Sequence, residues 1–162
     1  MSTIYVDNLS PNLGSRVLAA GHVVQVVNSN LSSNFTTTSS TPTAVVSVSI
    51  TPTSTSSKIL ISVFGMYYKN NTGVTSAGAG HWNISRNGTK LPGVNWPDNA
   101  GAYVVWTGSN GNEHIQPVVG AFLDSPATTS STTYALYLSS DNNSSSHIVY
   151  KGAEIIAQEI AQ

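Results

Sequence analysis

Apolar and polar residues alternate over short stretches along most of the chain, and turn-forming residues separate these stretches. Such alternation places one row of side chains in a core and the other in solvent, which is typical of β-strands. A polar stretch from Ser29 to Pro42 is expected to be a loop. The pattern predicts strands at residues 22–28, 44–50, 58–64 with an extension through 66–69, 81–86, 89–91, 102–107, 114–122, 132–138, 147–150 and 153–161.

Three local signals refine this pattern. Asn87-Gly88 lies between two short runs and predicts a type I′ hairpin turn, because that turn requires positive φ at both positions. Pro117 cannot donate a hydrogen bond to a neighbouring strand, which predicts an edge position or a bulge. Residues 153–161 suit a helix by propensity. Their place after a hairpin-rich chain, with Ile155 and Ile156 side by side, favours a strand instead.

The predicted strands indicate the fold class. About eight to ten strands at this spacing favour an all-β domain, an antiparallel two-sheet β-sandwich of the jelly-roll type. We expect this domain to span residues 21–162 and an extended N-terminal arm to occupy residues 1–20. The arm alone buries little surface, so we expect it to attach to another subunit or to an anchoring protein. Its candidate assembly residues are Ile4, Tyr5, Val6, Leu9 and Leu13.

Composition supports a packed β-domain with few charges. Hydrophobic residues make up 40% of the 162 positions, enough for a core, whereas charged residues make up 8%. Soluble domains typically carry about 25% charged residues. Low charge leaves little repulsion between copies and suits close packing in an assembly.

Charge and cysteine content exclude several partners and compartments. The net charge of −1 gives no basic excess for binding nucleic acid. No apolar stretch approaches the roughly 18 residues of a membrane-spanning helix, so no membrane insertion is expected. The chain starts without the pattern of a secretory signal peptide, which predicts synthesis in a cytoplasm. With zero cysteines, stability has to come from packing or subunit association.

Catalytic and metal-binding patterns are absent from the sequence. No nucleophile elbow, phosphate-binding loop or zinc-ligand spacing occurs, so we expect no enzymatic activity, no cofactor and no metal ion. We expect the four histidines to be satisfied in strands or loops; they are His22, His81, His114 and His147. We interpret the acidic residues, most of them in predicted turns or ends, as solvated; they are Asp7, Asp98, Glu113, Asp124, Asp141, Glu154 and Glu159.

Aromatic residues are concentrated in the middle third of the chain. Trp82 and Trp106 fall inside strand patterns and are expected in the core. Trp96, Asp98 and Asn99 lie in a predicted loop and form a candidate glycan-binding site, because an aromatic ring stacks on a sugar face while Asp and Asn supply hydrogen bonds.

Four segments, in this order, carry a resemblance to a known family: residues 21–27 (GHVVQVV), 50–61 (ITPTSTSSKILI), 122–129 (FLDSPATT) and 153–162 (AEIIAQEIAQ). They resemble a β-sandwich domain of tail-fibre-like and other virion structural proteins of marine and cyanobacterial phages. The resemblance covers most of residues 21–162. It implies a trimeric virion component without catalysis and does not identify the part of the particle that carries it.

The sequence therefore predicts a non-enzymatic bacteriophage structural protein on the virion surface, made in the host bacterial cytoplasm. The leading expectation is a short tail fibre or receptor-binding protein. A capsid decoration or cement protein that stabilises the head is the first alternative, and a free carbohydrate-binding module is the second. The expected partners are further copies in a homotrimer, tail, baseplate or major capsid proteins, and host surface glycan.

Overall fold

Antiparallel β-strands form all the regular secondary structure of the described residues. The computed structural model describes residues 20–70, 80–91, 103–104, 114–140 and 146–162. The strands are β1 (Val23–Asn30), β2 (Phe35–Thr37), β3 (Thr43–Ile50), β4 (Lys58–Asn70), β5 (Gly80–Arg86), β6 (Thr89–Lys90), β7 (Tyr103–Val104), β8 (His114–Asp124), β9 (Thr132–Ser140), β10 (Ser146–Val149) and β11 (Glu154–Ile160). No helix long and apolar enough to cross a membrane occurs in these ranges.

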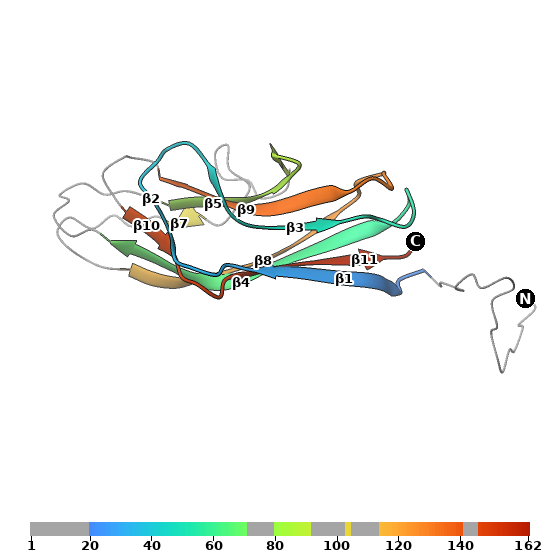
Figure 1. The fold of residues 1–162 in the computed structure, drawn as a ribbon, viewed down its shortest axis with the longest axis horizontal. Coiled ribbons are helices and arrows are strands. Elements are labelled where there is room, and N and C mark those ends of the chain that lie inside the picture. Colours follow the sequence, from blue (N-terminus) through green and yellow to red (C-terminus); the bar gives the residue numbers. More distant parts are fainter. Residues whose placement is uncertain (1–19, 71–79, 92–102, 105–113, 141–145) are drawn as a thin grey trace, which may run out of the picture.

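The strands form two sheets that face each other as layers (Figure 1). In sheet A, β4 lies in the centre. The strand β8 pairs with one side of β4 along its length, while β11 and then β10 pair with the other side. The strand β1 pairs with β11, and β2 pairs with β10. Sheet B has the order β3-β9-β5, with β6 and β7 both on β5.

The core lies between the two layers and is built from the inward rows of both sheets. Sheet A contributes side chains such as Ile61 and Val63 from β4, and sheet B contributes Leu136 from β9 and Trp82 from β5. Trp82 is 6% exposed, which confirms its expected place in the core. The connection Thr51–Ser57 and the C-terminal end of β11 lie at one end of the sandwich, and the meeting of β4 with β10 lies at the other.

Several local predictions are confirmed. Asn87 has φ of 49° and Gly88 has φ of 79°, as the hairpin turn between β5 and β6 requires. Within the described residues β8 pairs only with β4, so Pro117 lies on an edge strand. The C-terminal segment is a strand and not a helix, because it pairs with β1 on one side and β4 on the other. The all-β, two-sheet antiparallel sandwich is thus confirmed.

The predicted loop from Ser29 to Pro42 is wrong in part. Ser29 and Asn30 belong to β1, and Phe35–Thr37 forms the short strand β2. This strand pairs with β10, more than a hundred positions further along the chain, and Phe35 packs against the core. The strand β2 forms because of its tertiary contact with β10, and the polar sequence around it does not reveal that contact.

Candidate assembly surface

The outer face of sheet A carries a row of apolar side chains on two neighbouring strands. In β4 and β8, alternate residues point into the sandwich and the others point away from it. Directly opposite residues share a face, so the outward row consists of five cross-strand pairs. They are Leu60–Leu123, Ser62–Ala121, Phe64–Val119, Met66–Pro117 and Tyr68–Ile115. We name these ten positions the β4–β8 stripe.

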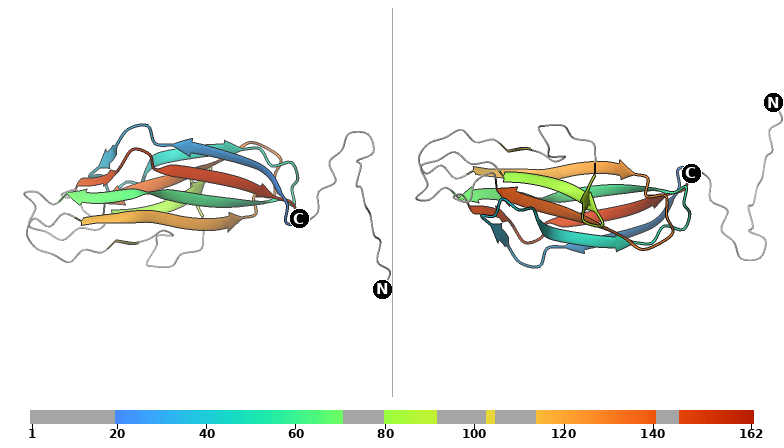
Figure 2. Two further views of the ribbon diagram at one scale, coloured as in Figure 1. Left: turned by 90° about the horizontal axis from the view of Figure 1, so that it is seen from below. Right: turned by 90° about the horizontal axis from the view of Figure 1, so that it is seen from above.

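The stripe contains most of the exposed large hydrophobic side chains of the described residues. Five of the seven belong to it: Phe64, Met66, Ile115, Val119 and Leu123, which are 43–58% exposed. The other two, Val23 and Val26, lie on β1 in the same sheet. Figure 2, in its left panel, looks onto sheet A from below, with β8 at one edge and β1 at the other. The exposed apolar surface is therefore concentrated on one sheet rather than scattered.

The size and polarity of the stripe set it apart from ordinary surface. None of its ten positions carries a charge, and Ser62 and Tyr68 supply its only hydroxyls. At the exposures above, its side chains present on the order of 600 Å² of apolar area, the upper end for the largest patch of a monomeric protein. A standard protein interface buries about 800 Å² on each partner. The stripe thus has the dimensions of an interface core.

A buried hydrogen-bonded cluster occupies the sandwich where β4 meets β10. The Tyr67 hydroxyl shares a hydrogen bond with Nδ1 of His147, and His147 Nε2 lies 2.9 Å from Oγ of Ser140. Lys69 is opposite His147 in the strand register and is 1% exposed. The two ring nitrogens of His147 therefore bridge the hydroxyls of Tyr67 and Ser140. The expectation of a satisfied histidine is confirmed at this position.

The Ser140–His147 pair has the spacing of a nucleophile and its base, but its surroundings differ from those of a catalytic site. A nucleophile has to reach the substrate from an open cleft. Ser140 is 2% exposed and His147 is 0% exposed. The pair therefore acts in this conformation as an internal polar contact between β9 and β10. Among the described residues, no group of three or more His, Cys, Asp or Glu side chains could hold a metal ion.

The expectation that Asp124 is solvated is wrong. Its side chain is nearly buried at the end of β8, where Arg86 Nη1 donates to both oxygens at 3.0 and 2.8 Å. Tyr134 donates a third hydrogen bond at 2.7 Å. Burial and this hydrogen bond to the Asp124 carboxylate raise the pKa of Tyr134 well above its usual value. The group joins β5, β8 and β9, so it ties the edge of sheet A to sheet B.

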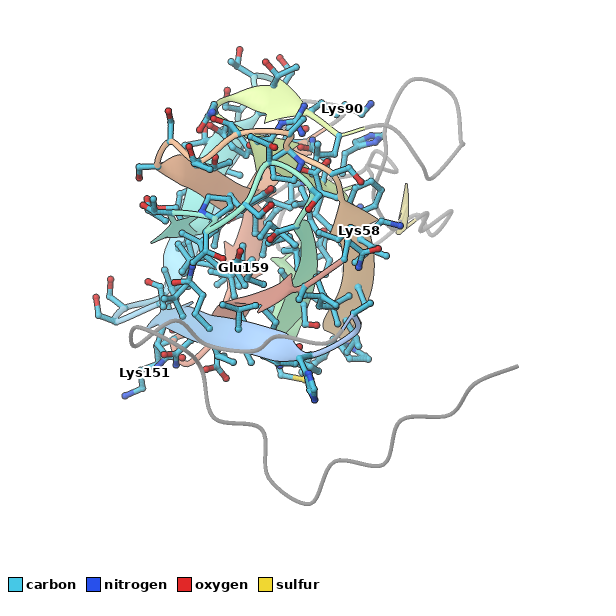
Figure 3. The ribbon with its side chains drawn as sticks, turned by 90° about the vertical axis from the view of Figure 1, so that its right-hand side faces the viewer. Lys58, Lys90, Lys151 and Glu159 are labelled. Carbon is cyan, nitrogen blue, oxygen red and sulfur yellow. The ribbon has the colours of Figure 1, made fainter. Side chains whose placement is uncertain are left out.

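The same expectation is wrong for Glu159, which is 0% exposed on β11. Its Oε1 accepts hydrogen bonds from Ser57 Oγ, Thr53 Oγ1 and Thr53 N, each 2.7 Å long, and its Oε2 accepts one from Gln25 Nε2 at 2.7 Å. Burial tends to raise the pKa of Glu159, but the hydrogen bonds from Ser57, Gln25 and Thr53 outweigh it and hold the pKa below its ordinary value. Figure 3 views this end, with Glu159 near the middle and Lys90 and Lys151 at the rim.

The candidate site residues of the sequence analysis lie outside the described residues. This holds for the glycan-binding loop of Trp96, Asp98 and Asn99, and for the assembly-arm residues Ile4, Tyr5, Val6, Leu9 and Leu13. Trp106 and the acidic residues Asp7, Glu113 and Asp141 also lie outside the described residues.

The β4–β8 stripe was not among the predicted sites, although the sequence contains its signal. Residues 58–68 and 115–123 are apolar at both odd and even positions over most of their length. A strand with one solvated face alternates, whereas a strand buried on both faces reads as a nearly continuous apolar run. In sheet A, the edge strand β8 and the central strand β4 both have this nearly continuous apolar sequence. It indicates that their outward face is a binding surface.

Neither a protein-family model nor a curated protein matches this sequence.

Proposed function

We propose that this protein is a non-enzymatic structural protein on the surface of a bacteriophage virion, a homotrimer of the short tail fibre or receptor-binding type. One structural observation carries the proposal: the β4–β8 stripe is an uncharged apolar face as large as an interface core. A protein whose task is assembly needs such a face. The resemblance of residues 21–27, 50–61, 122–129 and 153–162 to phage virion proteins supplies the biological setting.

Jelly-roll connectivity is part of this proposal, and the strand order supports it. In sheet A the longer strands follow the order β1, β11, β4, β8, and in sheet B the order is β3, β9, β5, with β7 next to β5. The chain changes sheet at most connections between these strands, as a double Greek key does. Jelly rolls are common in viral capsid and lectin domains, so this architecture suits both virion assembly and contact with glycans.

The arm and the loop keep their roles within the proposal. Residues 1–20 attach the protein to a tail or baseplate protein, and the sandwich projects from the particle. The loop with Trp96, Asp98 and Asn99 contacts host surface glycan through ring stacking and hydrogen bonds. Neither role requires a cofactor or a metal ion.

A capsid decoration or cement protein is the second candidate. The β4–β8 stripe is compatible with it, because a cement protein clamps neighbouring capsid subunits through an apolar face. A free carbohydrate-binding module is the weaker third candidate. It would be a monomer with measurable sugar affinity, and the β4–β8 stripe is at the upper end of size for an exposed apolar patch of a monomer.

Gold labelling of intact phage particles with antibody to this protein, viewed by electron microscopy, separates the candidates. We expect gold at the tail or its appendages. Gold over the head would instead identify a decoration or cement protein and would exclude a receptor-binding role for the loops. Particles without gold would contradict a place in the virion altogether.

Deletion of residues 1–20 tests the attachment role of the arm. We expect particles assembled with the truncated protein to incorporate much less of it than of the full chain, while the purified truncated protein keeps its β-sheet circular dichroism spectrum. Equal incorporation would contradict the anchoring role.

A further inference from the structure

We infer that the β4–β8 stripe is the surface through which copies of this chain bind one another. The inference deepens the proposed function and rests on it for the number of copies. The partner is a second copy of the chain, and the contacting residues are the outward rows of β4 and β8.

The strands β4 and β8 are apolar on both faces over most of their length. The inward row of β4, with Ile59, Ile61 and Val63, is completely buried between the sheets. The outward row is equally apolar, and Phe64 and Val119 face each other across the strands at its centre with 47% and 58% exposure. Two strands that are apolar on both faces are typical of sheets covered on both sides. In a trimer, the stripes of the other two copies would meet the stripe around the threefold axis and cover it as sheet B covers the inner face of sheet A.

The absence of charge on the stripe points to a second copy of the chain as its partner. Partners that meet transiently or differ in sequence are oriented by complementary charges. The ten stripe positions hold no charge, so they have no complementary charges that would orient a different protein on this surface. Interfaces of permanent homo-oligomers are the most apolar class and resemble a domain core cut in half. An uncharged apolar face is also compatible with itself, because no like charges meet when two copies approach.

The stripe is also large enough for a contact between copies. On the order of 600 Å² of apolar stripe per copy is close to the roughly 800 Å² per partner of a stable interface. Neighbouring outward residues of β11, such as Ile156 and Gln158, are half-buried and extend the face with a more polar margin. An apolar centre with a polar margin is the usual anatomy of an interface.

The test compares a charged stripe variant with a matched control by size-exclusion chromatography with multi-angle light scattering. Val119→Asp places a carboxylate at a position that is 58% exposed in one copy, so the single copy tolerates it. Ser47→Asp places the same charge on the exposed outer face of β3 in sheet B. We expect the wild type and Ser47→Asp to have three times the mass of one chain, and Val119→Asp to have the mass of one.

Cysteine variants keep the inference testable if Val119→Asp fails to fold. The chain has no cysteine, so Val119→Cys and Ser47→Cys each carry a single thiol. In the native assembly we expect Val119→Cys to react with a maleimide at least tenfold more slowly than Ser47→Cys. In urea the two rates become equal.

The outcomes separate this inference from the proposed function. A monomeric wild type at tens of micromolar, an unchanged mass for Val119→Asp, or equal thiol rates in the native state overturns the stripe as the contact between copies. None of these results bears on gold labelling, which tests the virion role. A wild-type mass of two chains that falls to one in Val119→Asp supports the stripe and overturns the threefold part of the proposed function.

Discussion

Replacement of Glu159 by glutamine keeps the size of a buried side chain but removes its charge. The wild-type carboxylate accepts four hydrogen bonds, three at Oε1 from Ser57 and Thr53 and one at Oε2 from Gln25. In the variant the amide NH2 replaces one acceptor oxygen, so it meets either the Gln25 donor or the donors of the 51–57 connection. The hydrogen bonds that remain lose their charge assistance.

The expected loss follows from these contacts. A hydrogen bond to a charged group contributes about 1.5–3 kcal/mol, and a neutral one about 1 kcal/mol. One lost acceptor and weaker remaining bonds give a loss of about 2–3 kcal/mol in the free energy of unfolding of Glu159→Gln at pH 7. For a chain of this size, that loss lowers the melting temperature by about 5–10 °C. Urea unfolding followed by circular dichroism measures this loss of stability. The two proteins are compared at equal chain concentration, because assembly adds stability.

The pH dependence gives a second reading of the same contact. The folded-state pKa of Glu159 lies below its ordinary value of 4.5, so its stabilising contribution is fully present above that value. The contribution is lost as the pH falls through the lower folded-state pKa, because the protonated carboxyl no longer holds four donors. Glutamine does not titrate. The difference in stability between wild type and Glu159→Gln should therefore shrink as the pH is lowered from 6 towards 3.

Glu154→Gln is the matched control, five positions away on the same strand. Glu154 is half-buried on the outer face and accepts one hydrogen bond from Asn28. A change of less than about 0.5 kcal/mol is expected for it, as for other surface substitutions. The reasoning is refuted if Glu159→Gln loses no more stability than Glu154→Gln, or if its deficit stays constant with pH.

Three further substitutions test other parts of the fold by urea unfolding. Gly80→Ala should lose about 1–3 kcal/mol, because the added Cβ overlaps the enclosed Tyr67 hydroxyl; unchanged stability would contradict this contact. Asp124→Asn should lose about 2 kcal/mol, since it weakens the acceptor of Tyr134 and removes an ion pair, and a loss under 0.5 kcal/mol would show that the group contributes little. Gly88→Ala should lose about 1 kcal/mol because φ is 79° there, and a neutral result would exclude the type I′ turn.

Much of the fold could be predicted from local sequence because strand formation leaves a local pattern. Alternation located the strands, and Asn87-Gly88 located a hairpin, since the turn depends on those two residues alone. Even the C-terminal strand, where helix propensity competes, has a period of two: Ile155, Ala157 and Glu159 are buried, and the residues between them are not. Pairing on both sides of β11 overrides the propensity.

The environments of Asp124 and Glu159 could not be predicted in this way. Asp124 follows a predicted strand and Glu159 lies inside one, and at both positions an acidic residue is ordinarily solvated. The donors that enclose Glu159 come from positions 102 to 134 residues away, and Arg86 lies 38 residues from Asp124. The hydrogen-bond donors that surround these carboxylates depend on which strands pair, and no pattern within one strand encodes them.

The buried carboxylates of this molecule have partners within the chain, whereas its exposed apolar side chains do not. This difference supports the assembly role. Glu159 and Asp124 lie inside, and each has several hydrogen-bond partners from other strands. Phe64 and Val119 lie on the outer face of sheet A, and no described residue covers their exposed surface. The sequence therefore provides partners for these buried carboxylates and leaves the apolar stripe open. Such a departure from ordinary packing is expected at a functional surface, where a partner completes the packing.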